Sequence, residues 1–272
     1  MTDRYAVIGN PVEHSKSPGI HSRFAALTGE DIAYERILAP TPGFAAIVAQ
    51  FRAGGGKGAN VTLPFKEQAA TLVDEVSARA QAAGAVNTLI FESDRIRGDN
   101  TDGCGLVRDL HSNLGFEIAT RRVLLLGAGG AARGVLLPLL EAHPSSITIA
   151  NRSLDKARRL VEALPPHWRS RVDACGYAEL SGQSFDLVVN ATSAGLTDTP
   201  LALPGRLYSA GSLAYDMVYG KDTTFLKQAR ADGAARTSDG LGMLVEQAAE
   251  SFFLWRGVRA PTAPVLLGLR SA

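Results

Sequence analysis

The chain of 272 residues is long enough for one large or two modest domains, each with its own hydrophobic core. Hydrophobic residues make up 46% of it and charged residues 20%, and 28 basic residues against 27 acidic ones give a formal net charge of +1. Because nucleic-acid grooves and membrane-facing surfaces need clustered cations, this balance favours neither a nucleic-acid nor a membrane partner.

The cysteines and the first residues favour a cytoplasmic protein. Only two cysteines occur, Cys104 and Cys175, and we expect reduced thiols rather than a disulfide scaffold. The first residues lead directly into the strand-like segment 6–9 and lack the apolar core of a signal peptide. No apolar stretch is long enough to cross a bilayer, and the five histidines are too scattered to predict a metal site.

The first third of the sequence predicts strands that alternate with helices. The expected strands are 5–9, 34–38 and a hairpin of 86–91 and 95–99. The expected helices are 18–27, 44–51 and 66–73. This alternation favours a mostly parallel sheet with helices on its faces.

A second series of elements begins near Thr101, with a helix expected over 104–114. The expected strands are 122–126, 146–150, 185–190 and 213–218. The expected helices are 131–140, 154–164 and 223–231. The first of these contains Pro138, and an internal proline can kink or shorten a helix. The series repeats a β-α-β unit, which is typical of a nucleotide-binding sheet.

A glycine-rich loop separates the leucine-rich strand 122–126 from the helix that follows it. The loop consists of Gly127, Ala128, Gly129, Gly130 and Ala131. Glycines in this setting allow a tight turn, close approach of a pyrophosphate and close packing of helix on strand. Amides at the start of the helix then face the phosphates. A plain glycine-rich turn is the alternative, but the strand and helix on either side favour a dinucleotide site.

The end of the second strand of this unit carries a cation where a carboxylate is common. The residues there are Asn151, Arg152 and Ser153, with Lys156 one turn into the next helix. An NAD enzyme places Asp or Glu here to hold the ribose 2′-hydroxyl, whereas a guanidinium can clamp a 2′-phosphate. We therefore expect NADP rather than NAD. The alternative is that Arg152 and Lys156 are only solvated surface cations.

An apolar-rich helix over 241–255 follows, and we expect it to return to the first domain because no strand comes after it. The sequence thus predicts an α/β fold with two domains. The N-terminal α/β substrate domain, with a mostly parallel sheet, is expected at 1–102 and is completed by 239–272. A Rossmann-type NADP-binding domain is expected at 103–238.

Four polar segments lie outside the glycine-rich loop. They read Ser-Lys-Ser-Pro at 15–18, Asn-Val-Thr-Leu-Pro-Phe-Lys at 60–66, Gly-Ala-Val-Asn-Thr at 84–88 and Gly-Asp-Asn-Thr-Asp-Gly at 98–103. Taken alone, Ser15 and Ser17 could simply cap a helix. The ordered set, together with Asp-Met-Val-Tyr at 216–219 and Asp-Gly-Leu-Gly-Met at 239–243, resembles the shikimate dehydrogenase family over nearly the whole chain.

The resemblance implies an NADP-dependent enzyme that reduces 3-dehydroshikimate to shikimate in chorismate and aromatic amino acid biosynthesis. Lys66 matches the catalytic lysine of the family, and Asp102 matches its partner. The residues that match substrate contacts are Ser15, Ser17, Thr62, Lys66, Asn87, Asp102, Tyr219 and Gln247. The residues that match cofactor contacts are Gly127, Ala128, Gly129, Gly130, Ala131, Asn151, Arg152, Ser153, Lys156, Thr192, Met217 and Gly240.

The chemistry of ketone reduction fits this assignment. Hydride addition builds negative charge on the carbonyl oxygen, and a nearby ammonium can stabilise that charge and supply the proton. We expect Lys66 to be the acid in reduction and the base in the reverse reaction, with Asp102 fixing its position. Without the resemblance, a surface ion pair worth about 0–1 kcal/mol would be the simpler interpretation.

Other functions stay open at this point. The nearest is a quinate/shikimate dehydrogenase with relaxed choice of substrate or cofactor, and a sensor that binds a metabolite without chemistry is another. A methylene-folate-type dehydrogenase would need aromatic stacking surfaces, and only 7% of the residues are aromatic. Lys221 stands where family members commonly carry proline, which leaves the placement of Tyr219 open. We expect a small-molecule substrate and a monomer or homodimer.

Overall fold

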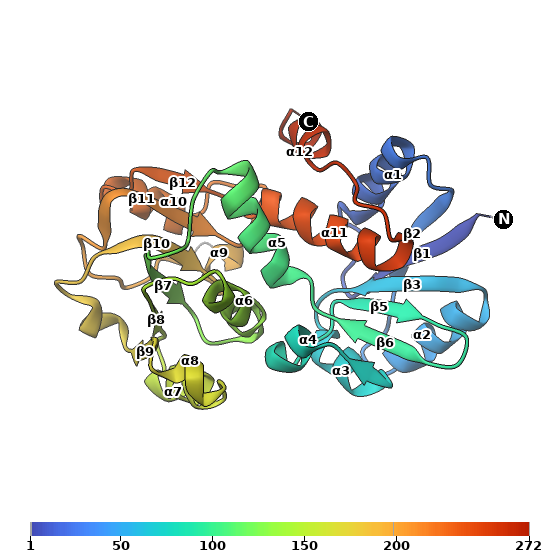
Figure 1. The fold of residues 1–272 in the computed structure, drawn as a ribbon, viewed down its shortest axis with the longest axis horizontal. Helices are drawn as coiled ribbons and strands as arrows, with labels where there is room; N and C mark the ends of the chain where they lie inside the picture. The colour runs from blue at the N-terminus through green and yellow to red at the C-terminus, as the bar shows by residue number, and fades with distance from the viewer. Residues whose placement is uncertain (1, 198, 272) are drawn as a thin grey trace. The chain divides into compact units, whose positions relative to one another are not determined.

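The computed structural model describes residues 2–197 and 199–271. The chain divides into two compact units, which are labelled in Figure 1 by their helices and strands. Unit 1 is Met1–Gly105 with Leu244–Ala272, and unit 2 is Leu106–Met243. The division expected from the sequence, at 102/103 and 238/239, differs from this one by a few residues at each junction.

Unit 1 contains a mixed six-stranded sheet in the order β2-β1-β3-β5-β6-β4. Its strands are β1 (Asp3–Gly9), β2 (Ile32–Leu38), β3 (Gly56–Val61), β4 (Glu75–Val76), β5 (Thr88–Phe91) and β6 (Ile96–Asp99). The pairs β1–β2, β1–β3 and β4–β6 are parallel, and β5 runs antiparallel to β3 and β6. The β5–β6 hairpin was predicted, whereas the strand β3 and the two-residue β4 were not.

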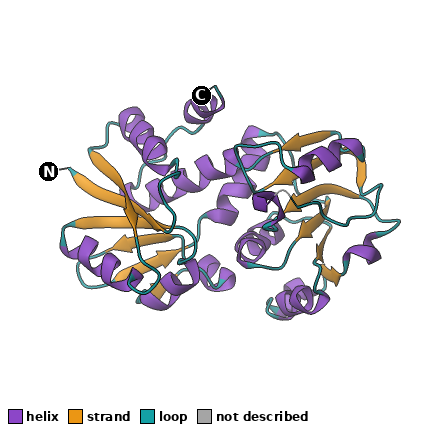
Figure 2. Cartoon of the chain, turned by 180° about the vertical axis from the view of Figure 1, so that it is seen from behind, coloured by secondary structure: helices purple, strands orange, loops and turns teal. Residues whose placement is uncertain are grey.

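Helices cover both faces of this sheet (Figures 1 and 2). They are α1 (Ser17–Thr28), α2 (Phe44–Ala53), α3 (Lys66–Leu72), α4 (Ala78–Ala83), α11 (Leu241–Arg256) and α12 (Ala263–Arg270). Under α2 and α3, Ala59 and Val61 of β3 join an apolar core with Phe44 and Phe65. Successive side chains of a strand point to opposite faces. Asn60, between those two apolar residues, therefore points to the other face, where it bonds to α11.

An aromatic cluster fills that other face between α1 and α11. His21 of α1 is completely buried and stacks on Tyr34, with ring centroids 4.2 Å apart and planes within 5° of parallel. Trp255 of α11 lies 5.4 Å from the His21 ring and donates from Nε1 to the Leu89 carbonyl at 2.9 Å. The C-terminal half of α11 is therefore an integral layer of unit 1.

Unit 2 contains an entirely parallel sheet in the order β12-β11-β10-β7-β8-β9. Its strands are β7 (Arg122–Leu126), β8 (Ser146–Ala150), β9 (Val172–Cys175), β10 (Phe185–Asn190), β11 (Tyr208–Asp216) and β12 (Arg236–Ser238). Renumbered within the unit, this is the strand order 6-5-4-1-2-3 of a dinucleotide-binding sheet. The strand order reverses between β7 and β10, and ligands of such sheets bind at that point.

Two apolar layers flank the sheet of unit 2. The helices of this unit begin with the end of α5 (Asp102–Arg108), whose residues up to Gly105 belong to unit 1. They continue with a π-helix (Asp109–Asn113), α6 (Gly130–Glu141), α7 (Leu154–Glu162), α8 (Pro166–Arg169), a 3₁₀ turn (Tyr177–Leu180), α9 (Ala194–Thr197) and α10 (Thr224–Ala231). The single helix predicted over 104–114 is thus an α-helix that ends at Arg108 and continues as a π-helix. The helix α6 continues past Pro138 to Glu141, so the proline does not shorten it.

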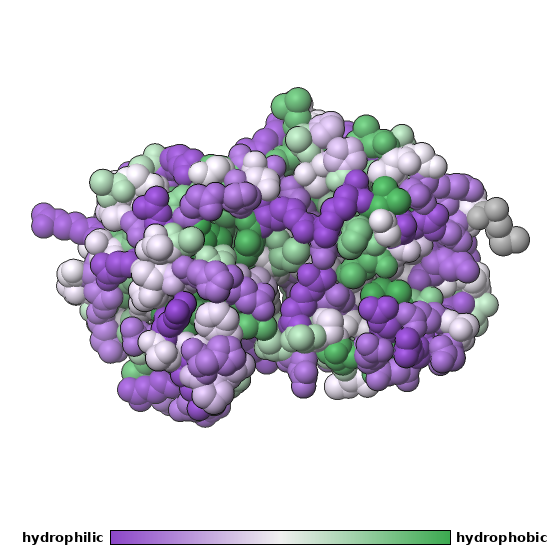
Figure 3. All heavy atoms as spheres, viewed as in Figure 1, coloured by the Kyte–Doolittle hydropathy of each residue, from purple (hydrophilic) through white to green (hydrophobic). Residues whose placement is uncertain are grey.

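Three further features concern the molecular surface, the length of the apolar helices and the two cysteines. Hydrophilic residues cover much of the face in Figure 3, and apolar residues form only small separate areas on it. Among the described residues, no helix is both long and apolar enough to cross a membrane. Cys104 and Cys175 are not joined by a disulfide bond.

We predict that His21 makes the stability of the protein depend on pH. Burial lowers the pKa of His21 from 6.5 to about 3, an effect only partly offset by Asn60, and within the described chain neither ring nitrogen has a hydrogen-bond partner. Between these two pKa values the unfolded state binds a proton that the folded state does not, so stability falls as pH falls. The slope should approach about 1.4 kcal/mol per pH unit.

The measurement is urea unfolding of the parent and of His21→Phe between about pH 7 and pH 5. His21→Phe keeps the ring stack on Tyr34 but removes the titrating nitrogens, so its stability should change less with pH. His14→Gln, at an exposed histidine of the same unit, is the control and should keep the parent slope. Equal slopes for the parent and His21→Phe would contradict the prediction.

Candidate active site

Lys66 and Asp102 form an ion pair in unit 1. They are the first residues of α3 and α5, and Lys66 Nζ lies 2.5 Å from Asp102 Oδ2. Their side chains keep 28% and 16% of their surface exposed, so the pair is largely shielded from water and still accessible. Phe65 is buried and stacks on Phe44, which anchors the chain at the start of α3. The lysine therefore projects from a fixed backbone.

The other carboxylate oxygen of Asp102 is bound by Asn87. Asn87 Nδ2 donates to Asp102 Oδ1 at 2.8 Å, and Asn87 Oδ1 accepts from the Thr101 amide at 2.9 Å. Because one end of the carboxamide donates and the other accepts, its orientation is fixed. Asp102 is consequently held on both oxygens, by an ammonium on one and by an amide on the other.

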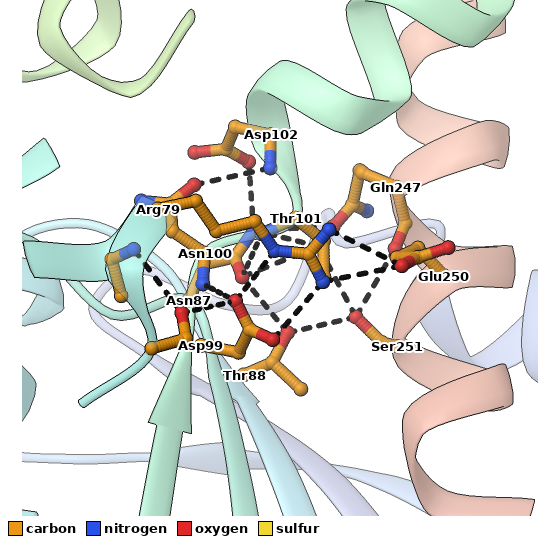
Figure 4. Close-up of polar contacts among 12 residues, drawn as sticks. Arg79, Asn87, Thr88, Asp99, Asn100, Thr101, Asp102, Gln247, Glu250 and Ser251 are labelled. Atoms are coloured by element: carbon orange, nitrogen blue, oxygen red, sulfur yellow. Dashed lines mark hydrogen bonds and ion pairs between the residues drawn. The ribbon is translucent and has the colours of Figure 1, made fainter. Parts of the chain in front are cut away.

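Gln247 joins the same cluster from α11. Its Oε1 accepts from Thr101 Oγ1 at 3.2 Å and lies 3.5 Å from Asn87 Nδ2, while its Nε2 donates to the Leu244 carbonyl at 3.0 Å. Figure 4 shows Gln247 on its helix facing the turn that carries Thr101 and Asp102. Residues predicted from four separate segments of the sequence therefore converge in unit 1.

Ser15, Ser17 and Thr62 lie beside the start of α1 and the end of β3. Ser15 Oγ accepts from the Ser17 amide at 3.3 Å, and Lys16, not either serine, occupies the N-cap position of α1. The Thr62 amide donates to the Ile8 carbonyl at 3.0 Å. A Cβ on Gly9 would come 2.3 Å from Thr62 Cγ2, so the glycine provides the space that the threonine occupies.

A buried polar network, which the sequence did not reveal, extends from Tyr34 to Asn87. Tyr34 donates from its hydroxyl to Asn60 Oδ1 at 2.7 Å, and Asn60 Nδ2 donates to Ser251 Oγ at 2.9 Å. Ser251 Oγ lies 2.8 Å from Thr88 Oγ1, which donates to Asn87 Oδ1 at 2.8 Å. The hydrogen bond from Thr88 thus fixes the orientation of Asn87 in addition to the hydrogen bond from the Thr101 amide.

The Tyr34 end of the network lies near Ser17. Burial raises the pKa of Tyr34 well above 10, and the Ser17 side chain partly offsets this effect. Two sequence signals could have found the network. Asn60 stands in the Asn-Val-Thr motif, and Ser251 stands one helical turn after Gln247. Tyr34 has no such signal, because only the pairing of β1 with β2 and β3 places it near Asn60.

In unit 2, the glycine-rich loop joins β7 to α6 where the strand order reverses. Gly127 has a φ of +106°, and a Cβ there would come 3.1 Å from the Ala191 carbonyl oxygen. Gly129 differs, because a Cβ built at this N-cap of α6 meets no described atom within 4 Å. The loop and first helical turn also contain Ala128, Gly130 and Ala131. The space at Gly129, beside the positive end of a helix, fits a pyrophosphate.

The turn after β8 presents cations to solvent. Asn151 Nδ2 donates to the Ser153 carbonyl at 2.8 Å, and the side chains of Arg152, Ser153 and Lys156 are exposed. The Arg152 charge partly offsets the burial that raises the pKa of Tyr177. Exposed cations at the end of the second strand of such a sheet can reach a 2′-phosphate.

The loops after β10 and β11 are joined by a buried amide and a buried carboxylate. Asn190 Nδ2 donates to Asp216 Oδ2 at 3.2 Å, and Asn190 Oδ1 accepts from Thr192 Oγ1 at 2.7 Å. Burial raises the pKa of Asp216, and its hydrogen-bond donors partly offset that effect. A Cβ on Gly240 would come 2.3 Å from the Met217 carbonyl oxygen, so glycine alone permits this close approach.

Tyr219 is half-buried in unit 2, and burial raises the pKa of its hydroxyl. The next residue, Gly220, has a φ of +80° and donates its amide to Asp239 Oδ2 at 3.0 Å. The loop that contains Lys221 in place of the common proline is therefore tethered by a hydrogen bond.

The predicted site residues fall into one set in each unit. Unit 1 holds Ser15, Ser17, Thr62, Lys66, Asn87, Asp102 and Gln247. Unit 2 holds Tyr219 and all the residues predicted to contact the cofactor. Within the part of the chain that the structure describes, no three His, Cys, Asp or Glu side chains are grouped to hold a metal ion.

Three family models match successive parts of the chain. The shikimate dehydrogenase substrate binding domain matches residues 7–89, the shikimate/quinate 5-dehydrogenase family matches 109–198, and the shikimate 5′-dehydrogenase C-terminal domain matches 240–266. A shikimate dehydrogenase (NADP(+)) from Aromatoleum aromaticum is 59% identical over 270 residues, which cover 98% of this chain and 97% of that protein.

Solved structures agree over the whole fold. An Ael1 enzyme from Pseudomonas putida is 51% identical with a TM-score of 0.94, and the match covers 98% of both chains. A shikimate 5-dehydrogenase from Thermus thermophilus, in complex with NADP(H) and shikimate, is 34% identical with a TM-score of 0.87, covering 99% of both. The chain belongs to the shikimate dehydrogenase family.

Proposed function

We propose that this chain catalyses the reversible reduction of 3-dehydroshikimate to shikimate by NADPH, a step of chorismate biosynthesis. The observation that carries the proposal is the Lys66–Asp102 pair, in which Asn87 binds the second carboxylate oxygen of Asp102. Family membership alone leaves the chemistry of this chain open, because one fold hosts several reactions. An ammonium fixed against a carboxylate, among buried hydrogen-bonding side chains, suits reduction of a hydroxylated ring ketone.

Lys66 is the proposed acid and base. NADPH, when bound, supplies the hydride, and the negative charge that develops on the carbonyl oxygen is stabilised by the Lys66 ammonium. Lys66 then donates one proton to that oxygen, so a ketone, a hydride and a proton yield the alcohol. Oxidation reverses these steps, with neutral Lys66 accepting the hydroxyl proton. Because Lys66 keeps 28% of its side-chain surface exposed, it can exchange the proton with water.

The proposed substrate contacts suit a polyhydroxylated anion. Ser15 and Ser17 offer hydroxyl donors for the carboxylate, and Thr62, Asn87 and Gln247 offer groups for ring hydroxyls. Such a site rejects analogues that lack a hydroxyl, because a buried polar partner is then left without its hydrogen bond. Tyr219 is a further proposed contact.

NADP is the proposed cofactor of unit 2. The space at Gly129 fits the pyrophosphate, and Arg152 and Lys156 fit the 2′-phosphate. Thr192, Met217 and Gly240 lie on loops at the carboxyl ends of β10, β11 and β12, where parallel sheets bind their ligands.

The direct test is consumption of NADPH by the purified protein with 3-dehydroshikimate, with shikimate identified as the product. Parallel assays with quinate and NAD test the broader quinate/shikimate activity. Absence of NADPH consumption would refute the proposed reaction, and comparable turnover of quinate with NAD would favour the broader one.

For Lys66→Met we predict a fall in turnover of about 10²-fold or more, the usual contribution of a positioned general acid. The KM for 3-dehydroshikimate should change much less, because the other polar contacts remain. The assay is steady-state NADPH oxidation. Lys57→Met, at an exposed lysine of β3, is the control and should keep the parent turnover. Turnover of Lys66→Met near the parent value would remove Lys66 from the reaction.

Two glycines of the same loop should behave differently. Gly127→Ala should lower the melting temperature, because alanine is strained at positive φ by about 1–2 kcal/mol and its Cβ approaches the Ala191 carbonyl. Gly129→Ala should keep the melting temperature and raise the KM for NADPH about tenfold, equivalent to about 1.4 kcal/mol of binding. Thermal melts and NADPH titrations check both. An unchanged KM for NADPH in Gly129→Ala would contradict the proposed pyrophosphate site.

Arg152→Ala should weaken binding of NADPH and leave binding of NADH nearly unchanged. A charge-assisted hydrogen bond to the 2′-phosphate contributes about 1.5–3 kcal/mol, so the KM for NADPH should rise about tenfold or more. Steady-state kinetics with both cofactors measure the selectivity, and Arg158→Ala, an exposed arginine of α7, is the control. An equal loss with both cofactors would contradict the role in recognising the 2′-phosphate.

A further inference from the structure

Unit 1 also contains a cluster of four charged side chains, which is connected by hydrogen bonds to the turn that carries Asp102. Arg79 of α4 grips Asp99 with two hydrogen bonds, Nε to Oδ1 at 2.7 Å and Nη2 to Oδ2 at 3.0 Å. The same guanidinium donates to Glu250 Oε1 at 3.2 Å, and Glu250 Oε2 accepts from Arg259 at 2.6 Å. The cluster thus has two cations and two anions, and Figure 4 shows Arg79 between Asp99 and Glu250.

One end of this cluster leads to Asp102 through three hydrogen bonds in series. Asp99, which is 6% exposed, accepts from the Asn100 amide at 2.6 Å and from Ser77 Oγ at 2.6 Å, as well as from Arg79. Asn100 Oδ1 accepts from the Asp102 amide at 3.1 Å, and Asn100 Nδ2 donates to the Ala85 carbonyl at 3.0 Å. The backbone that carries Asp102 is therefore fixed by a turn that is itself anchored by the Arg79 guanidinium and the Ser77 hydroxyl.

The other end of the cluster leads to Gln247. Glu250 stands on α11, three residues after Gln247 and next to Ser251, whose hydroxyl holds Asn60. One guanidinium in α4 therefore fixes both segments, the turn before α5 and the helix α11, that bring Asp102 and Gln247 to the site.

The energetics favour a geometric role for this cluster. Taking charges out of water costs free energy, so buried ion pairs contribute little net stability, and apolar residues of similar size often replace them without loss. A guanidinium fork, however, fixes distance and angle with respect to a carboxylate. Arg256 provides a contrast, because it bridges Asp3 and Glu30, neither of which is a predicted site residue.

We propose that Arg79 is a positioning residue, which sets the orientation of Asp102 and Gln247 toward the substrate through Asp99 and Glu250. The proposal rests on the proposed function, because it assigns those two side chains to the substrate. It adds a residue that touches neither substrate nor cofactor. Its signature is a change in the kinetics of the substrate without a change in those of the cofactor.

The test compares Arg79→Lys and Arg79→Ala with the parent and with the matched control Arg256→Lys. Both Arg79 variants should raise the KM for 3-dehydroshikimate and lower kcat, with a combined loss in kcat/KM of about tenfold or more, because small misplacements near reacting groups are costly. The KM for NADPH should stay within about twofold of the parent. A loss of folded enzyme would lower apparent kcat alone and leave both KM values unchanged.

The control separates positioning from stability. Arg256→Lys removes a similar guanidinium bridge from unit 1 and should lower the melting temperature at most, with both KM values unchanged. Added guanidinium ion should partly restore kcat/KM in Arg79→Ala, because the side chain is 26% exposed and the vacated site is open to solvent. Added ammonium should restore it less, since it lacks the planar fork.

The result that would overturn the proposal is a kcat/KM in both Arg79 variants within about twofold of the parent, or a loss in kcat alone like that of an unstable variant. A crystal structure of Arg79→Ala gives a readout that does not need turnover. The hydrogen bonds of Asp102 with Lys66 and Asn87 should lengthen or break, and intact bonds would also overturn the proposal. Failure of the proposed function is distinct, since it would appear in the parent as absence of NADPH consumption.

Discussion

The site in unit 1 depends on how one carboxylate is shared. Asp102 offers its two oxygens to different partners, Oδ2 to the Lys66 ammonium and Oδ1 to the Asn87 amide. A rotation of the carboxylate would break both contacts, so the position of the ammonium is set by the turn that carries Asp102. In a partly dehydrated setting these contacts are stronger than in water, and the loss of one costs more.

The alternation of β3 explains why a polar network can be buried here. Ala59 and Val61 point into the apolar core under α2 and α3, and Asn60 between them points to the opposite face, beside Ser251 of α11. That face is covered by helices, so water does not satisfy its polar groups. Asn60, Ser251 and Thr88 bond to one another instead, and this chain of hydrogen bonds leaves few alternative side-chain orientations.

Much of the fold could be predicted, for a physical reason. The strands β7, β8 and β10 have the predicted bounds because buried parallel strands are continuous apolar runs that end in glycine or asparagine. The short edge strands β9 and β12 were missed, since each is short and carries polar residues. The predicted site residues come from local motifs. The contact of Asn60 with Ser251 joins residues 191 positions apart, and only tertiary structure creates it.

The two units place different demands on the sequence. In unit 2 the expected phosphate site is formed by the backbone of a glycine-rich loop. The sequence motif contains Gly127 and Gly129 alike, but only the structure shows that the fold needs the positive φ of Gly127 and leaves open space at Gly129. In unit 1 the site is built from side chains that bond to one another. A change of Asn87 would therefore also remove a hydrogen bond from Asp102 Oδ1 and one from the Thr101 amide. Under the proposed function, substrate choice would depend on the whole network, whereas cofactor choice would depend on exposed residues such as Arg152 that can change one at a time.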